Sequence, residues 1–160
     1  MRDDPVVIGI AQAGVLRETG HLVSYALGSC VVICLYDRER CVAGMVHVML
    51  PGEEAAIDRK NPFKFADSGC RELVRLMVER GAERRHITAK IAGGACMFQG
   101  ERSLGAIGER NVQAVRETLR LLHIPILGAD TGKDHGRTID LDAATGILTV
   151  KTVRLGTLTL

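Results

Sequence analysis

Val31-Val-Ile-Cys-Leu-Tyr36 and Val42-Ala-Gly-Met-Val-His-Val-Met-Leu50 are two apolar runs separated by the charged stretch Asp37-Arg-Glu-Arg40. Runs of this length, rich in β-branched residues and divided by a short polar turn, predict two antiparallel strands joined as a hairpin. The runs are short and adjacent, so we expect them to pack together. The hydrophobic patterns before and after this hairpin predict the helices and strands that surround it.

Hydrophobic periodicity predicts two helices. The first follows Phe65, with Asp67 or Ser68 as its N-cap, and stops at Gly81, whereas the second runs from about Gly108, as a cap, to Leu122. Further strands are predicted over the following ranges: Val6–Ile10, Ile87–Ile91, His123–Leu127, Arg137–Leu141 and Ile147–Val153. With roughly seven or more strands, mostly in hairpins, the pattern predicts an α+β fold. We expect a mostly antiparallel sheet with the two helices on one face.

Length and composition narrow the class of protein. The chain has 160 residues, of which 46% are hydrophobic and 25% charged, and it predicts a single globular domain over residues 1–160. A net charge of +2, an aromatic content of 3% and the lack of Trp argue against nucleic-acid binding. No apolar stretch reaches the ~18 residues of a membrane span, and no signal peptide is apparent. We therefore expect a cytoplasmic protein without membrane insertion.

The cysteines and histidines show no spacing typical of a metal site or a disulfide framework. Five cysteines, an odd number, include no Cys-x-x-Cys pair, and no two histidines stand four residues apart. Most of these thiols are expected to be small buried hydrophobes, Cys34 and Cys96 among them. We predict no metal and no cofactor.

Cys30 is the exception among the thiols, because it follows the turn Gly28-Ser29 and directly precedes a strand. Backbone N–H groups at such a turn can stabilise a thiolate and then an oxyanion. His47 interrupts the second apolar run and is the candidate base, with Ser24 as the candidate third group that orients it. The competing interpretation is a buried core cysteine and a hydrogen-bonded core histidine.

If Cys30 and His47 act together, the expected chemistry is amide hydrolysis. His47 accepts the thiol proton, which gives a thiolate–imidazolium pair and a lowered cysteine pKa. The thiolate attacks an amide carbonyl, the amides near Ser29 and Cys30 hold the oxyanion, and water resolves the thioester. The sequence therefore favours a cysteine amidohydrolase.

Two glycine-containing segments, Gly93-Gly94-Ala95 and Ile107-Gly-Glu-Arg-Asn111, resemble a phosphate-binding turn followed by a helix only weakly. No Lys or Ser/Thr follows at P-loop spacing, so nucleotide binding is not expected. A tight turn and a helix start explain these residues more simply.

The ordered set of segments resembles the CheD family of chemoreceptor glutamine deamidases. The blocks that carry the resemblance are Leu27-Gly-Ser-Cys30, Ala43-Gly-Met-Val-His47-Val-Met-Leu-Pro51, Lys64-Phe-Ala-Asp67, Lys90-Ile-Ala-Gly-Gly-Ala-Cys-Met-Phe98, Ile107-Gly-Glu-Arg-Asn111, Asp130-Thr-Gly132 and Gly136-Arg137. They span about Val7 to Val153, nearly the whole chain. The resemblance implies a three-layer α/β/β fold like that of the cytotoxic necrotizing factor toxins.

The resemblance also implies the residues of the site. Cys30 corresponds to the nucleophile, His47 to the base, and Ser24 stands where the family typically has Thr. Gly28, Ser29, Gly94 and Asn111 are assigned to oxyanion and substrate binding. Lys133 stands where the family has a glycine, and Lys adopts a positive φ less readily than Gly.

The implied substrate is the cytoplasmic helical coiled coil of a methyl-accepting chemoreceptor, whose glutamines become glutamates with release of ammonia. Many members also bind CheC, a phosphatase of the phosphorylated response regulator CheY. The alternative function is therefore a regulatory binding partner of a CheC-type phosphatase, with weak or no deamidase activity.

Overall fold

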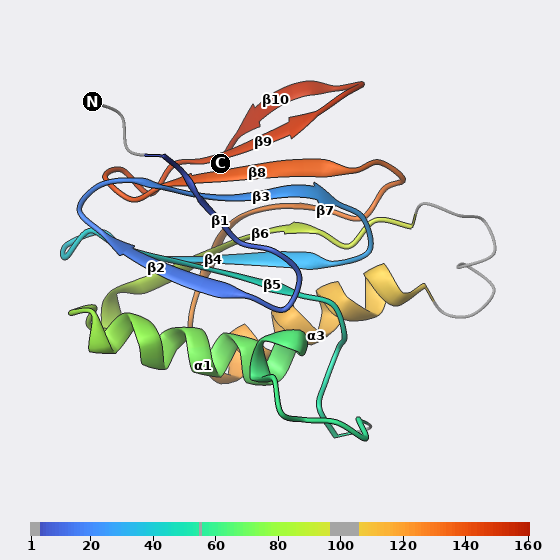
Figure 1. Ribbon diagram of the computed structural model, residues 1–160, viewed down its shortest axis with the longest axis horizontal. Coiled ribbons are helices and arrows are strands. Elements are labelled where there is room, and N and C mark those ends of the chain that lie inside the picture. Colours follow the sequence, from blue (N-terminus) through green and yellow to red (C-terminus); the bar gives the residue numbers. More distant parts are fainter. Residues whose placement is uncertain (1–3, 55, 97–105) are drawn as a thin grey trace.

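The computed structural model describes residues 4–54, 56–96 and 106–160, which form three stacked layers (Figure 1). Two five-stranded sheets lie face to face, and helices α1 (Ala66–Glu79) and α3 (Ile107–Leu121) cover the outer face of one of them. The predicted α+β class, the three layers and the position of the helices on one face are confirmed. Met97 and Phe98 of the resembling blocks lie outside the described residues.

The sheet beneath the helices has the strand order β2-β5-β4-β6-β7. Its centre is the predicted hairpin, in which β4 pairs antiparallel with β5 on one side and with β6 on the other. Only β7 runs parallel to its neighbour, because α3 connects it to β6. The strands span Ala13–Arg17 (β2), Val31–Asp37 (β4), Val42–Val48 (β5), Ile87–Gly93 (β6) and Ile126–Thr131 (β7).

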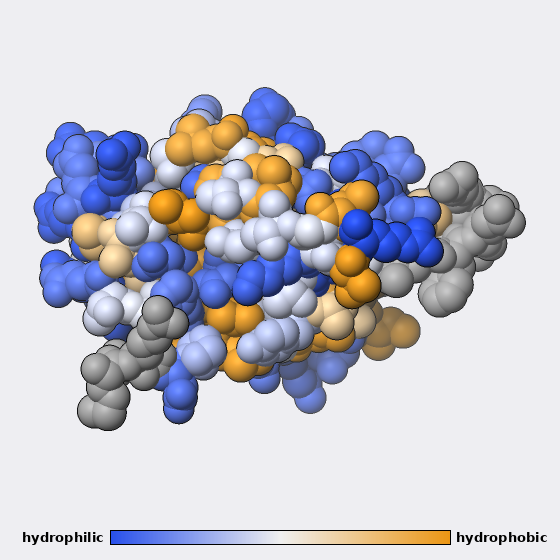
Figure 2. Space-filling model, turned by 90° about the horizontal axis from the view of Figure 1, so that it is seen from above, coloured by the Kyte–Doolittle hydropathy of each residue, from blue (hydrophilic) through white to orange (hydrophobic). Residues whose placement is uncertain are grey.

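The second sheet has the order β1-β3-β8-β9-β10. Along β8 and β9 apolar side chains that face the first sheet alternate with polar ones that face outward, as expected of a sheet covered on one side. Figure 2 shows this outer face, where apolar and polar side chains are interspersed. The strands span Val6–Val7 (β1), His21–Leu27 (β3), Arg137–Asp142 (β8), Leu148–Thr152 (β9) and Gly156–Thr159 (β10).

Strand β4 separates the two hydrophobic cores of the molecule. Its odd-numbered side chains, such as Ile33, pack against α1 and α3, and its even-numbered ones, such as Val32, pack against the second sheet. Successive side chains of a strand point to opposite faces, so a nearly continuous apolar run is what a strand buried on both faces requires. Every residue of β4 except Tyr36 is buried.

Several predicted boundaries are wrong. Helix α1 begins at Ala66 with Phe65 as N-cap, because the Phe65 side chain enters the core and its backbone is extended. Asp67 and Ser68 therefore lie in the first turn, and Gly108 lies inside α3. The helix stop at Gly81 is confirmed by its φ of +104°.

The strand predicted over His123–Leu127 begins at Ile126 instead, since His123 has a φ of +57° and still belongs to the turn that follows α3. The strands β2, β3 and β10 were not predicted.

Gly108 brings α3 into direct contact with the end of β6. A Cβ at this position would lie 2.5 Å from the carbonyl oxygen of Ala95 and 2.6 Å from that of Gly94. In a helix Gly→Ala ordinarily stabilises by about 1 kcal/mol. Here we expect Gly108→Ala to destabilise the protein by about 1–3 kcal/mol, because backbone atoms must move.

Urea unfolding measures this change, and Gln113→Ala on the exposed face of the same helix should shift stability by less than about 0.5 kcal/mol. A Gly108→Ala protein more stable than the wild type would contradict the close contact.

Candidate functional site

Cys30 lies on the three-residue connection that crosses from the second sheet to the helix-covered sheet. Leu27 ends β3 and Val31 begins β4, so Gly28, Ser29 and Cys30 bridge the layers at one end of the sandwich. All three carbonyl groups accept hydrogen bonds: Gly28 from Ala95 N (3.0 Å), Ser29 from Asn111 Nδ2 (3.0 Å) and Cys30 from Gly94 N (2.8 Å). The turn is therefore held by the β6–α3 connection and by α3 itself.

His47 lies on β5 with its side chain between the two sheets, where only 3% of the residue is exposed. Its Nδ1 is 2.8 Å from Oγ of Ser24, which comes from β3 in the opposite sheet. The Ser24 hydroxyl also donates to the carbonyl of Ile8 at 2.7 Å. A hydroxyl has one hydrogen, so Oγ must accept from His47 Nδ1–H. This assigns the proton to Nδ1 and leaves a lone pair on Nε2.

The second ring nitrogen of His47 is available as a base. Nε2 is buried and has no hydrogen-bond partner among the described residues. A buried polar atom without a partner is uncommon and calls for an explanation. A base whose proton donor is a neighbouring thiol or a substrate supplies one.

Strand register places Cys30 on the same face of the sheet as His47. Val32 is directly opposite His47 in the β4–β5 pair, and Cys30 precedes Val32 by two residues. Residues i and j±2 across an antiparallel pair are diagonal neighbours about 7–8 Å apart, within reach of long side chains. The structure thus brings Ser24 and His47 into contact, and the register places Cys30 just beyond the end of β4, on the face of the sheet that carries His47.

Burial shifts the pKa values of both Cys30 and His47. Burial raises the pKa of the Cys30 thiol, although a hydrogen bond from its own backbone amide opposes the change. Burial lowers the pKa of His47, opposed by a hydrogen bond to the backbone of Ile8. These directions run against the expected thiolate–imidazolium pair with a lowered cysteine pKa, which stays a prediction. Both directions favour a neutral thiol beside a neutral imidazole.

The residues assigned to oxyanion and substrate binding divide into two groups. The amide of Gly94 already donates to the carbonyl of Cys30, and the side-chain nitrogen of Asn111 donates to two carbonyls. In contrast, the backbone amides of Ser29 and Cys30 donate to no other residue in the part of the chain that the structure describes. The amide of Gly28 likewise donates to no described residue, so all three amides of the turn are left as donors for an oxyanion.

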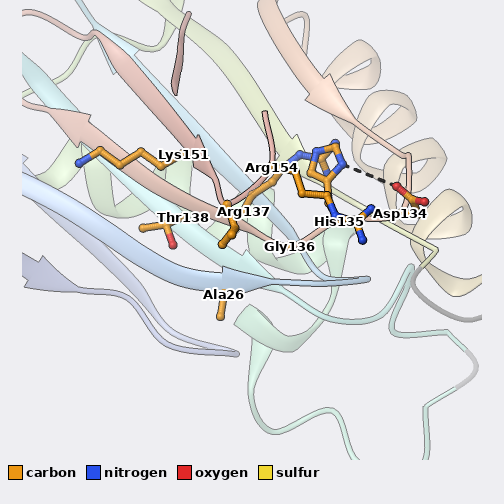
Figure 3. A pocket seen from close by; sticks show the side chains of 9 residues that line it. Ala26, Asp134, His135, Gly136, Arg137, Thr138, Lys151 and Arg154 are labelled. Atoms are coloured by element: carbon orange, nitrogen blue, oxygen red, sulfur yellow. Dashed lines mark ion pairs between the residues drawn. The ribbon is translucent and has the colours of Figure 1, made fainter. Parts of the chain in front are cut away.

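A buried ion pair supports the other side of the turn, and sequence reasoning missed it by interpreting this segment as loop chemistry. Arg137 is 1% exposed, its Nε donates to Asp130 Oδ2 at 3.0 Å, and its Nη1 approaches the carbonyl oxygen of Gly93 at 3.5 Å. Arg137 also lines a groove of about 580 Å³ with Asp134 and His135 (Figure 3).

Lys133 in the same loop has a φ of +61°, in the left-handed region that favours glycine. The carbonyl of Lys133 accepts a hydrogen bond from Cys96 N at 2.9 Å.

Of the other cysteines, Cys34 is buried as predicted, whereas the prediction that Cys96 is buried is wrong, because Cys96 is partly exposed. Cys34 and Cys70 are buried in the cores, and burial raises the pKa of Cys70 to about 12. Cys41 is half-buried in the turn between β4 and β5, at the far end of the strands from Cys30. The described residues contain no group of three or more His, Cys, Asp or Glu that could hold a metal ion.

The raised pKa of Cys30 predicts the pH dependence of its alkylation. The thiolate is the reactive form, and a folded-state pKa above the ordinary value of about 8.5 keeps its fraction small at neutral pH. We expect the iodoacetamide rate at Cys30, followed by peptide mass spectrometry, to rise about tenfold per pH unit from pH 7 to beyond 8.5. A rate that is already level at pH 7 would instead show the thiolate–imidazolium pair.

Comparison with known proteins places the chain among its relatives. The family model described as "CheD chemotactic sensory transduction" matches residues 49–152, which lie after the three candidate catalytic residues. A protein of Methanosarcina barkeri named "Probable chemoreceptor glutamine deamidase CheD" is 43% identical over 91% of this chain and 95% of its own. A protein of the same name from Moorella thermoacetica is 44% identical over 96% of this chain and 93% of its own.

A crystal structure of the Bacillus licheniformis hypothetical protein YfiH covers 71% of this chain and 46% of its own, at 16% identity and a TM-score of 0.42. A score this low supports no argument, so the likeness to the toxin fold stays a prediction. The family match and the near-full-length relatives are sufficient by themselves: the chain belongs to the CheD family.

Proposed function

We propose that the chain is a chemoreceptor glutamine deamidase in which Cys30 is the nucleophile, His47 the base and Ser24 the residue that orients the base. The relatives' names support the reaction class. The observation that carries the assignment of residues is the 2.8 Å hydrogen bond between Ser24 and His47, because it directs the lone pair of His47 to the unpartnered Nε2. A nucleophile, a base and an orienting group are the parts that nucleophilic catalysis needs.

The first half-reaction forms a thioester. As the Cys30 sulfur attacks the side-chain amide carbon of a glutamine, Nε2 of His47 takes the thiol proton. The tetrahedral oxyanion accepts hydrogen bonds from the amides of Ser29 and Cys30. His47 then returns the proton to the departing nitrogen, and ammonia leaves.

The second half-reaction restores the enzyme. His47 removes a proton from water, the hydroxide adds to the thioester carbonyl, and the sulfur leaves with that proton. The products are a glutamate side chain and the free Cys30 thiol. Ser24 holds the proton on Nδ1 of His47 while Nε2 accepts and donates the transferred proton. The same neutral tautomer of His47 therefore serves in both half-reactions.

The neutral resting pair fits a general-base mechanism. A thiol whose pKa is raised needs a base in contact as it attacks, whereas a preformed thiolate would not. A His47 whose pKa is lowered stays unprotonated at neutral pH and is ready to accept that proton. Both directions therefore suit a mechanism in which the thiol is deprotonated as it attacks the glutamine.

The proposed substrate is an exposed glutamine on the cytoplasmic helices of a methyl-accepting chemoreceptor, where conversion to glutamate adds negative charge. The proposed location is accordingly cytoplasmic, and the proposed unit of function is one domain over residues 1–160. Among the described residues no helix is long and apolar enough to cross a bilayer.

A regulatory role toward a CheC-type phosphatase stays a second prediction. Its support was the pair of departures from the family pattern, Ser24 and Lys133. Ser24 nevertheless makes the hydrogen bond to His47, and Lys133 adopts the positive φ of a glycine. The active enzyme is therefore the better-supported function. A phosphatase assay with and without this protein tests the alternative, and an unchanged rate would remove it.

Substitution of the nucleophile tests the proposed function. We expect the wild type to convert glutamines of a chemoreceptor cytoplasmic fragment to glutamates, detected by peptide mass spectrometry. Cys30→Ala should reduce the conversion to background, and His47→Ala should lower kcat/KM by at least about 100-fold, the usual contribution of a general base.

Cys41→Ala is the matched control, because Cys41 is a half-buried thiol remote from the site, and it should retain wild-type activity. Conversion that persists in purified Cys30→Ala protein would disprove the mechanism, and its absence in the wild type would disprove the function.

A further inference from the structure

The side chain of Asn111 joins the two segments that carry the proposed nucleophile and base. Asn111 lies on α3, is fully buried, and donates from Nδ2 to the carbonyl of Ser29 at 3.0 Å and to that of Met49 at 3.1 Å. Ser29 directly precedes Cys30, and Met49 follows His47 by two residues. One amide group thus spans the gap between the turn and the end of β5.

This bridge stands where the strand ladder stops. The last pair of β4 and β5 is Val31 with Val48, so continued pairing would place Cys30 opposite Met49. The amide of Met49 instead donates to the carbonyl of Lys64 at 3.0 Å, so the two strands separate at this point. Beyond the ladder, the hydrogen bonds of Asn111 take over the task of holding the segments together.

The helix that carries Asn111 is itself fixed against the turn. Gly108, one helical turn earlier, leaves no room for a Cβ beside the carbonyls of Gly94 and Ala95. Gly94 in turn donates to the carbonyl of Cys30. The position of Asn111 relative to Cys30 is therefore determined by backbone contacts, and its side chain transmits that position to β5.

These contacts leave Asn111 no free donor for the oxyanion role predicted from the sequence. A side-chain amide has two hydrogens, and both are used on the carbonyls of Ser29 and Met49. The other amide atom, Oδ1, is a buried acceptor without a partner among the described residues, and it cannot stabilise negative charge.

We propose that Asn111 is a positioning residue for the deamidation, and that its two hydrogen bonds set the separation between the Cys30 thiol and the His47 imidazole. This inference rests on the proposed function. Proton transfer from thiol to Nε2 requires hydrogen-bond contact, and a misplacement of about 1 Å in such a pair can cost about 100-fold in rate.

Asn111→Asp tests the role, because the side chain keeps its shape and loses both donors when ionised. We expect kcat to fall at least about tenfold, with KM changed by less than about twofold, since the residue holds the reacting groups and not the substrate. The loss should shrink toward acidic pH, where a protonated carboxyl donates one of the two hydrogen bonds again. Asn111→Ala should lose activity at every pH.

Thr118→Val is the matched control, since Thr118 is also a buried polar residue of α3 but donates only within the helix, to Ala114 at 2.8 Å. It should retain the kcat of the wild type. Folding of each variant is checked by circular dichroism. Wild-type kcat in folded Asn111→Asp and Asn111→Ala proteins, or an equal loss in Thr118→Val, would overturn the positioning role.

Alkylation separates this inference from the proposed function, because it needs no receptor. If Asn111 positions the turn, both Asn111 variants should change the iodoacetamide rate at Cys30 at least about fivefold and leave that at Cys41 unchanged. Unchanged rates at both cysteines would overturn the positioning role even in a protein without deamidase activity. A wild type that deamidates no glutamine, together with altered iodoacetamide rates at Cys30 in the variants, would overturn only the proposed function.

Discussion

The burial of β4 on both of its faces organises the whole molecule. Its side chains fill one core against the helices and a second core against the other sheet, so β5 and β6 must flank it and two layers must cover it. Both cores end where β4 begins, and the chain crosses there from one sheet to the other through Gly28, Ser29 and Cys30. A thiol at this point is anchored by a rigid strand on one side and half-exposed on the other. Sites built on strands in this way hold their geometry better than sites on loops.

The hydrogen bond between Ser24 and His47 connects this scaffold to chemistry. It joins the two sheets, because Ser24 belongs to β3 and His47 to β5, and so the tautomer of the base depends on how the sheets stack. Burial raises the pKa of the Cys30 thiol and lowers that of the His47 imidazole, and both directions favour the neutral forms. In the proposed mechanism, the thiolate accordingly forms as the thiol attacks the glutamine.

Much of this architecture could be predicted from the sequence, because its signals are local. The two apolar runs around Asp37 to Arg40 indicated the central hairpin, and helical periodicity indicated α1 and α3. Cys30 was found because it follows a turn and directly precedes a strand. His47 was found because it is a polar residue within an apolar strand. The strands β2 and β10 escaped prediction because they are short and at sheet edges, where neighbours and not local sequence decide pairing. Strand β3 escaped it because a register shift between Ser24 and Leu27 interrupts the alternation of buried and exposed residues. The pairing of Ser24 with His47 was predicted, but the bridge that Asn111 makes to Met49 was not, because it connects segments 62 residues apart that only the stacked layers bring together. The ion pair of Arg137 with Asp130 joins residues only seven apart, and it was missed because the segment was interpreted as a loop.

Capture of the covalent intermediate tests the central claim most directly. The wild-type protein is mixed with a chemoreceptor cytoplasmic fragment, quenched in acid during turnover, and digested for peptide mass spectrometry. The account predicts a receptor segment joined through a thioester to the peptide that contains Cys30, released by hydroxylamine and accompanied by free ammonia. Deamidation that proceeds without any adduct on Cys30, or with the adduct on another cysteine, would contradict it.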